Sequence, residues 1–254
     1  MNRFENKVAI ITGGSGSIGF ETAKKLASEG AKILMVDINE TTLKEKQAEA
    51  KAANLDISYE VADVTKSDDV KKYVNTCLER YGKIDYFFNN AGIEGIVKPM
   101  VDYPEEEFDK VLAVNVKGVF LGMKYVSQKI EDGGSIVITS SIAGLQGNAN
   151  MIAYTTSKHA EIGIMRTATL ELASRKVRVN TVHPGMVDNR MMRSLEEGMN
   201  PGHGNEVKKS FESAIPLQRY AKPTDISNMV AFLFSDESSY ANGALFVLDG
   251  GMKA

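Results

Sequence analysis

The 254-residue sequence has only one cysteine, Cys77, so an intrachain disulfide framework is excluded. A nearly cysteine-free chain is typical of a reducing compartment, and we expect a cytoplasmic protein. Cys77 lies within the helical pattern VKKYVNTCLERYG. A buried structural thiol explains that position better than a reactive nucleophile does.

Long apolar runs, an excess of one charge and metal-ligand spacing are also missing. No apolar run is long enough to cross a membrane, and a strand-like segment begins by Lys7, which leaves no room for a signal peptide. The net charge is −3, with basic and acidic residues interspersed, so nucleic-acid binding is not indicated. His159, His183 and His203 lack metal-ligand spacing, and we expect no metal site. The TSS stretch has no G-x-S-x-G elbow around it, which argues against a serine nucleophile.

Short β-branched runs alternate with amphipathic stretches, without repeats, linkers or low-complexity tracts. Continuous apolar strands between helices predict a parallel sheet covered on both faces. We expect a single-domain α/β protein over residues 1–254, with a Rossmann-type doubly wound sheet of about seven strands. The expected strands are 7–12, 32–37, 57–62, 83–89, 134–140, 176–182 and 244–249, and the expected helices lie near 18–29, 40–54, 67–81, 105–130, 151–174 and 224–235.

Residues 190–215 break this alternation and contain no strand pattern. We expect them to form a partly helical lid over the carboxyl ends of the strands. Met186, Met191, Met192 and Met199 gather in and around this segment. These adaptable side chains either fill gaps in a core or line an apolar substrate pocket.

A glycine-rich loop, TGGSGSIG, follows the first expected strand and opens the next helix. Glycines there let the backbone approach a pyrophosphate, whose charge the helix N-terminus favours. The second strand ends in Asp37, eighteen residues after Gly19. Its carboxylate can bind both ribose hydroxyls of an adenosine and would repel a 2′-phosphate, which predicts NAD rather than NADP. The alternative role for Asp37 is a helix N-cap.

Tyr154 and Lys158 are four residues apart in an amphipathic run, AYTTSKHAEIGIM. Side chains at this spacing share one face of a helix, so the phenol and the ammonium can meet at one site. Chance placement on a helix surface is the alternative.

Together these residues resemble the short-chain dehydrogenase/reductase family of about 250 residues, over essentially the whole chain. The matching elements occur in the family's order: the loop from Thr12 to Gly19, ADV with Asp63, NNAG from Asn89 to Gly92, VNVKG with Asn115, ITSS with Ser141, YTTSK with Tyr154 and Lys158, and HPG with Pro184 and Gly185. Ser141 also lies thirteen residues before Tyr154, which is the family spacing.

The resemblance implies a catalytic set of Asn115, Ser141, Tyr154 and Lys158. It implies cofactor contacts from Gly13, Ser15, Ser17, Ile18, Gly19, Asp37, Ile38, Asp63, Val64, Asn90, Ala91, Gly92, Tyr154, Lys158, Pro184, Gly185, Val187 and Asn189. Two positions depart from the family pattern. Ser17 stands where the middle glycine belongs, and it adds a Cβ but also a hydroxyl that could donate to a phosphate. Asn189 replaces a frequent threonine, and its amide can still hydrogen-bond a nicotinamide carboxamide.

The implied chemistry is hydride transfer between NAD(H) and a secondary alcohol or ketone. An ordinary phenol, with a pKa of about 10, is too weak a base at neutral pH, so we expect Lys158 and the oxidised nicotinamide to lower the pKa of Tyr154. Ser141 would then hold the substrate oxygen, and Lys158 the nicotinamide ribose. Asn115 would anchor a water that links Lys158 to solvent, unless it is only a helix-interior asparagine bonded to backbone.

Three functional interpretations follow. NNAGIEG and KHAEIGIMR look most like the branch that acts on cyclic or alicyclic alcohols and ketones. A 3-oxoacyl-carrier-protein reductase shares the four catalytic positions but usually prefers NADPH. A non-catalytic NAD-binding scaffold should have lost part of this set. In addition, apolar stripes around 105–130 and 151–174 exceed what one sheet can cover and indicate a subunit interface, unless they are only the broad core faces of a monomer. The family resemblance implies a second contact through the last strand, so we expect a homotetramer, or a dimer if that second contact is weak.

Overall fold

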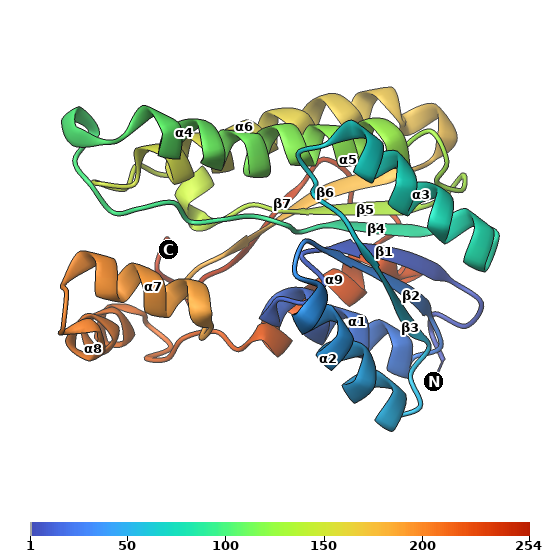
Figure 1. The fold of residues 1–254 in the computed structure, drawn as a ribbon, viewed down its shortest axis with the longest axis horizontal. Coiled ribbons are helices and arrows are strands. Elements are labelled where there is room, and N and C mark those ends of the chain that lie inside the picture. The colour runs from blue at the N-terminus through green and yellow to red at the C-terminus, as the bar shows by residue number, and fades with distance from the viewer. Residues whose placement is uncertain (1) are drawn as a thin grey trace.

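One parallel sheet forms the centre of the computed structural model, which describes residues 2–254 (Figure 1). The strand order is β3-β2-β1-β4-β5-β6-β7, and every neighbouring pair is parallel. The order reverses direction between β1 and β4, which is where open α/β sheets place their ligands. The strands are β1 (Val8–Thr12), β2 (Lys32–Asp37), β3 (Ile57–Val61), β4 (Tyr86–Asn89), β5 (Ser135–Thr139), β6 (Arg178–Pro184) and β7 (Leu245–Leu248).

Helices cover both faces of the sheet (Figure 1). One layer contains α1 (Ser17–Ser28), α2 (Glu40–Ala52) and α9 (Pro223–Phe234). The other contains α3 (Ser67–Tyr81), α4 (Glu105–Leu112), α5 (Val119–Val126) and α6 (Ile152–Glu171). The expected doubly wound fold is confirmed.

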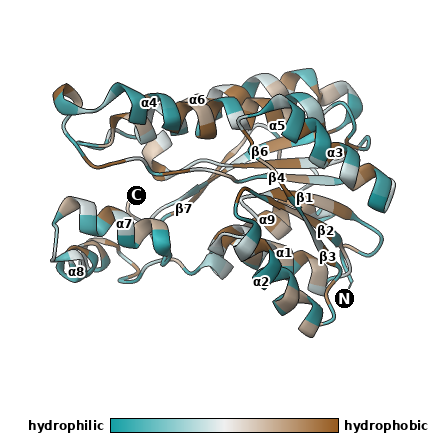
Figure 2. Cartoon of the chain, in the orientation of Figure 1, coloured by the Kyte–Doolittle hydropathy of each residue, from teal (hydrophilic) through white to brown (hydrophobic). Residues whose placement is uncertain are grey.

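The alternation of side chains along each strand builds two cores at once. Ile10 and Leu34 pack with the α3 and α6 layer, whereas the adjacent Ile11 and Met35 pack with the α1 and α9 layer. Figure 2 shows the resulting pattern, with apolar strands at the centre and polar residues on the outer helix surfaces. Cys77 belongs to the first of these cores and is fully buried, and burial raises the pKa of its thiol to about 12.

The predicted element ranges agree with the structure to within about three residues, except in the segment 105–130. There a π-helical turn, η2 (Ala113–Gly118), separates α4 from α5, and the helix ends at Val126. Apolar periodicity does not reveal such a turn, because the side chains on both sides of it remain amphipathic.

Residues 190–215, expected to be partly helical, contain α7 (Arg190–Met199) and α8 (Gly204–Ala214). A small separate core joins them to the body of the protein, with Met192 and Leu195 of α7 packed against Met151 and Tyr220. Within the described residues, no helix combines the length and apolar character needed to span a membrane.

Candidate active site

A cavity of about 930 Å³ opens at the carboxyl ends of the strands. Its walls run from the glycine loop and Asp37 at one end to α7 of the lid at the other. Most of the predicted site residues line it: Gly13, Ser15, Ser17, Ile18, Gly19, Asp37, Asn90, Gly92, Ser141, Tyr154, Lys158, Pro184, Gly185, Val187 and Asn189.

The glycine loop is a tight turn that only glycine can form at two positions. Gly13 has a φ of +62°, in the left-handed region. A Cβ on Gly19 would lie 2.2 Å from the carbonyl oxygen of Gly13, inside any permitted contact. Ser17, in contrast, is the exposed first residue of α1 and does not have a positive φ. The chain therefore accommodates a serine there without backbone strain.

Asp37 hydrogen-bonds to the glycine loop through Oδ2, and its Oδ1 accepts from the backbone N–H of Asn39 at 3.2 Å. Its Oδ2 accepts from the backbone N–H of Ser15 at 3.2 Å and from the Ser15 hydroxyl at 2.7 Å. The N-cap of α2 is Asn39, whose side chain accepts from the N–H of Thr42. The helix-cap alternative for Asp37 is thus wrong. No lysine or arginine among residues 2–254 lies within ion-pair distance of this carboxylate, which lines the cavity without a cation partner.

Asn90 and Ala91 lock the loop after β4 to the end of β1. Their backbone N–H groups both donate to the hydroxyl of Thr12, at 2.9 and 3.1 Å. The side-chain amide of Asn90 also donates to the Thr12 carbonyl and accepts from Thr139. This network holds together the ends of the neighbouring strands β1 and β4 at the cavity.

Four predicted cofactor contacts do not line the cavity: Ile38, Asp63, Val64 and Ala91. Ile38 follows β2 and is 68% exposed. The carboxylate of Asp63 accepts from both the N–H and the hydroxyl of Thr65, at 3.0 and 2.7 Å. These two residues lie beyond the carboxyl ends of β2 and β3, near the end of the cavity that Asp37 borders.

Asn115 is buried within η2, away from the cavity wall. Its side chain pairs with the backbone of Ile93 in both directions, accepting from the N–H and donating to the carbonyl at 2.9 Å each. It donates as well to the hydroxyl of Ser157 at 3.0 Å. The residue therefore clamps the loop after β4 to α6, which carries Tyr154 and Lys158.

Ser141, Tyr154 and Lys158 come together on one wall of the cavity. Tyr154 lies in the first turn of α6, and the ammonium of Lys158, one turn later, is 5.5 Å from the centre of its ring. Ser141 follows β5 and caps a short 3-10 turn, where its hydroxyl accepts from the N–H of Ala143. The expected meeting of these three side chains is what the fold produces.

In the protein without cofactor, the pKa of Tyr154 is raised above its ordinary value. Burial is the main cause, and the nearby Glu161 adds to it. Lys158 and the hydroxyl of Ser141 lower the pKa of the phenol but do not overcome burial. The protein on its own therefore keeps Tyr154 protonated, as a proton donor needs to be.

Three further groups at the site were not predicted from the sequence. Glu161 is fully buried and forms an ion pair with Lys158. His183 is buried behind Ser141, and its Nδ1 lies 2.9 Å from the Ser141 carbonyl oxygen. Glu94, after β4, pairs with Arg190 of α7 at 3.1 Å and so joins the cavity rim to the lid. The sequence held one signal for the role of Glu161: it lies three positions after Lys158, and residues at that spacing share a helix face.

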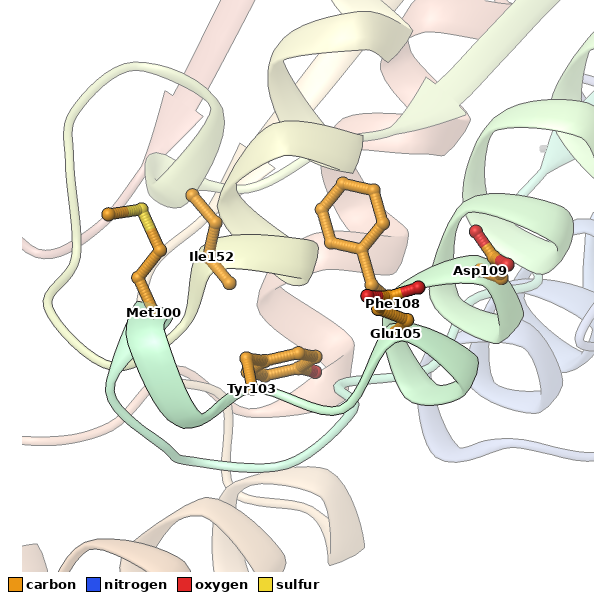
Figure 3. Close-up of a pocket in the computed structure, with 6 residues that line it drawn as sticks. All are labelled: Met100, Tyr103, Glu105, Phe108, Asp109 and Ile152. Carbon is orange, nitrogen blue, oxygen red and sulfur yellow. The ribbon is translucent and has the colours of Figure 1, made fainter.

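Apolar side chains line the lid end of the cavity, and all four methionines noted in the sequence are among them: Met186, Met191, Met192 and Met199. Asn189 begins α7 by accepting from the N–H of Met192, which leaves its amide nitrogen available as a donor. Beside the site, a second hollow of about 370 Å³ lies between α4 and the start of α6 (Figure 3). Its six lining residues include two carboxylates, Glu105 and Asp109, and no cation.

Comparison with known proteins fits this geometry. A family model described as enoyl-(acyl carrier protein) reductase matches residues 13–253. Levodione reductase of Leifsonia aquatica is 36% identical over 99% of this chain and 96% of its own length. The chain belongs to the short-chain dehydrogenase/reductase family.

Other members of the short-chain dehydrogenase/reductase family are similarly close. Cyclohexanol dehydrogenase of an Acinetobacter species is 35% identical, over 98% of this chain and 96% of that one. The 3-oxoacyl-(acyl-carrier-protein) reductase of Thermotoga maritima is 37% identical, over 98% and 99%. The crystal structure of levodione reductase superposes with a TM-score of 0.94 at 36% identity and covers 98% of both chains. NAD⁺-bound xylitol dehydrogenase superposes with a TM-score of 0.91 at 35% identity and covers 98% and 99%.

Members of the short-chain dehydrogenase/reductase family use a nicotinamide cofactor, and the residues present here fit one. The close approach of Gly19 to Gly13 leaves bare backbone at the N-terminus of α1, where a pyrophosphate would be held. The cavity extends from that loop to Tyr154 and Lys158, so one dinucleotide could reach both ends. The chain is therefore an oxidoreductase of alcohols and ketones by family.

Proposed function

We propose that this protein transfers hydride between NAD(H) and a secondary alcohol or ketone that is cyclic or apolar. The observation that carries the proposal is the convergence of Ser141, Tyr154 and Lys158 on one wall of a cavity whose far end holds Asp37. The cofactor, when bound, supplies or accepts the hydride. The protein holds the substrate oxygen and moves a proton.

Tyr154 is the proposed acid and base. In the reducing direction its phenol donates a proton to the oxygen of the former carbonyl, and its raised pKa keeps that proton in place. In the oxidising direction it takes the proton from the alcohol, helped by the ammonium of Lys158. Ser141 holds the same oxygen from the other side and stabilises the charge that develops on it. Asn115, by clamping the loop after β4 to α6, keeps Lys158 in place and would anchor the water that links Lys158 to solvent.

The preference for NAD rests on Asp37. Its carboxylate points into the cavity without a neighbouring cation and so suits ribose hydroxyls better than a 2′-phosphate. The similar xylitol dehydrogenase has NAD⁺ bound in its crystal structure, which supports the same choice. In the same proposal, Ile38, Asp63 and Val64 contact the adenine, and Asn189 contacts the nicotinamide through its free amide nitrogen.

The substrate class rests on the lid end of the cavity. Methionines with flexible side chains suit an apolar ring that presents few hydrogen-bonding groups. Two of the relatives are named for cyclic substrates, levodione and cyclohexanol. We place the protein in the cytoplasm, because its one cysteine, Cys77, is a buried thiol and reduced thiols are typical of that compartment.

A second candidate is the reduction of a 3-oxoacyl thioester, which the Thermotoga maritima relative favours by its name. The uncompensated carboxylate of Asp37 argues against the NADPH that this reaction usually employs. A panel of cyclic, steroid and acyclic alcohols and ketones, together with an acetoacetyl thioester, should be assayed with both cofactors at the nicotinamide absorbance. We expect the highest kcat/KM for a cyclic substrate with NAD(H), and no activity with any of them would reject the proposal.

A further inference from the structure

Glu161 is a buried carboxyl group that the proposed reaction does not use. It lies on α6, one turn after Lys158, and has no exposed surface. Its Oε1 accepts from the ammonium of Lys158 at 2.8 Å. Its Oε2 is also buried and has no hydrogen-bond partner among the described residues. A half-satisfied buried carboxyl is costly and calls for a reason.

The geometry ties Glu161 directly to the reacting group. An ammonium has three donors, and Lys158 uses one for Glu161 and one for the carbonyl of Thr139 at 2.9 Å. The third is left for the cavity, where the ring of Tyr154 lies 5.5 Å away. The charge that Tyr154 experiences is therefore the charge of a pair, not of Lys158 alone.

Few other charges act on this pair. On α6 itself, Glu161 interacts with the charges of Lys158 and Tyr154, and the hydroxyl of Ser140 lies near its carboxyl group from the end of β5. From β6, His183 is near enough for Lys158 to lower its pKa, although burial is the larger cause of that shift. After β4, Glu94 acts on Tyr154. Lys158 is the one cation within ion-pair distance of Glu161 in residues 2–254.

Burial raises the pKa of Glu161 to about 7, and Lys158 opposes this shift. The carboxyl thus changes its charge in the neutral range, where an ordinary glutamate is already ionised. When ionised, it offsets the ammonium of Lys158 and disfavours the phenolate of Tyr154. When protonated, it leaves the ammonium unopposed, which favours the phenolate.

We propose that Glu161 is a positioning residue that sets the effective charge of Lys158 and, through it, the pH range in which Tyr154 exchanges its proton. The inference rests on the proposed role of Tyr154. It also implies that the three ionisable groups titrate as one coupled system, with apparent pKa values that belong to the set.

The first test is the pH profile of kcat/KM for alcohol oxidation by Glu161→Gln. Glutamine keeps the shape and can still accept from Lys158 but carries no charge. We expect the apparent pKa of the ascending limb, on which activity rises with pH as Tyr154 loses its proton, to fall by about one pH unit, with the affinity for NADH unchanged by fluorescence titration. Glu171→Gln removes an exposed carboxylate from the same helix and should leave the profile as it was. A Glu161→Gln profile that superposes on the parent profile would overturn the proposal.

The second test needs no turnover, and its deciding measurement is made on the unmodified protein. Most carboxyl groups titrate well below neutral pH, so the infrared carbonyl band of one protonated carboxyl should persist in the unmodified protein and disappear with a midpoint near 7. Glu161→Gln should remove that band, and Glu171→Gln should keep it. The absence of such a band at neutral pH rejects the role of Glu161 even if Tyr154→Phe abolishes turnover, so this failure is distinct from a failure of the proposed function.

Discussion

Tyr154 is where the proposed chemistry can be tested with the smallest change. Tyr154→Phe removes the phenolic oxygen but keeps the aromatic ring on the cavity wall. We expect turnover to fall by about 10²–10⁴-fold, the usual contribution of general acid–base catalysis. Affinity for NADH should stay within a few-fold, as measured by fluorescence titration. A variant with nearly parental kcat would remove Tyr154 from the mechanism.

Asp37 gives a prediction about cofactor choice. Asp37→Ala deletes the uncompensated carboxylate and with it the repulsion of a 2′-phosphate. The ratio of kcat/KM for NADP to that for NAD should rise by about tenfold, which corresponds to about 1.4 kcal/mol. Asp68→Ala, at an exposed carboxylate on α3, serves as the control. An unchanged ratio in Asp37→Ala would show that the carboxylate only holds Ser15.

At this scale, the sequence identified residues whose roles depend on spacing along one element. Tyr154 and Lys158 share a helix face, and Ser141 follows a strand, so local pattern was sufficient to place them. The sequence did not predict that burial raises the pKa of Tyr154 in the protein without cofactor, because burial depends on how α6 packs, and no sequence pattern reports that. Glu161 was missed for a related reason, since an acid in an amphipathic helix usually faces water.

The glycine loop and α1 form the element on which cofactor binding depends. Gly19→Ala places a Cβ 2.2 Å from the Gly13 carbonyl, and backbone there cannot move without opening the turn. We expect a stability loss of about 1–3 kcal/mol and loss of measurable NADH binding in calorimetry. Gly163→Ala on α6, whose Cβ meets no atom within 4 Å, is the matched control and should bind NADH normally.

Most strands and helices could be predicted because each is a continuous apolar or amphipathic run between glycine or polar turns. The exception, η2, depends on a contact between distant segments. Asn115 in η2 hydrogen-bonds to the backbone of Ile93, which follows β4. These two segments are far apart in the sequence, so the contact can be seen only in the folded structure.

At the scale of the whole molecule, exposed apolar side chains support the proposed homotetramer. Phe120 on α5 is 50% exposed and Leu170 on α6 is 79% exposed. These helices lie in the two segments whose apolar stripes are wider than the sheet of one chain can cover. Val247 on the edge strand β7 is 43% exposed, at the second proposed contact. We expect light scattering to give four times the chain mass of 27.7 kDa.

Leu170→Glu should lower that mass to a dimer without unfolding the chain, because an exposed glutamate costs the monomer little. Glu171→Gln, at the neighbouring exposed position, should leave the tetramer intact. A monomer mass for the unmodified protein would reject both proposed contacts.

Labelling of the buried Cys77 thiol can be used to measure how often the core beneath α3 opens. This thiol is enclosed by the core beneath α3 and is protonated at pH 8, so a thiol-reactive dye cannot label the closed form. Labelling then proceeds only through molecules in which that core has come apart. The rate of dye incorporation, measured at a series of denaturant concentrations, gives the free energy of that opening at a single, naturally occurring site.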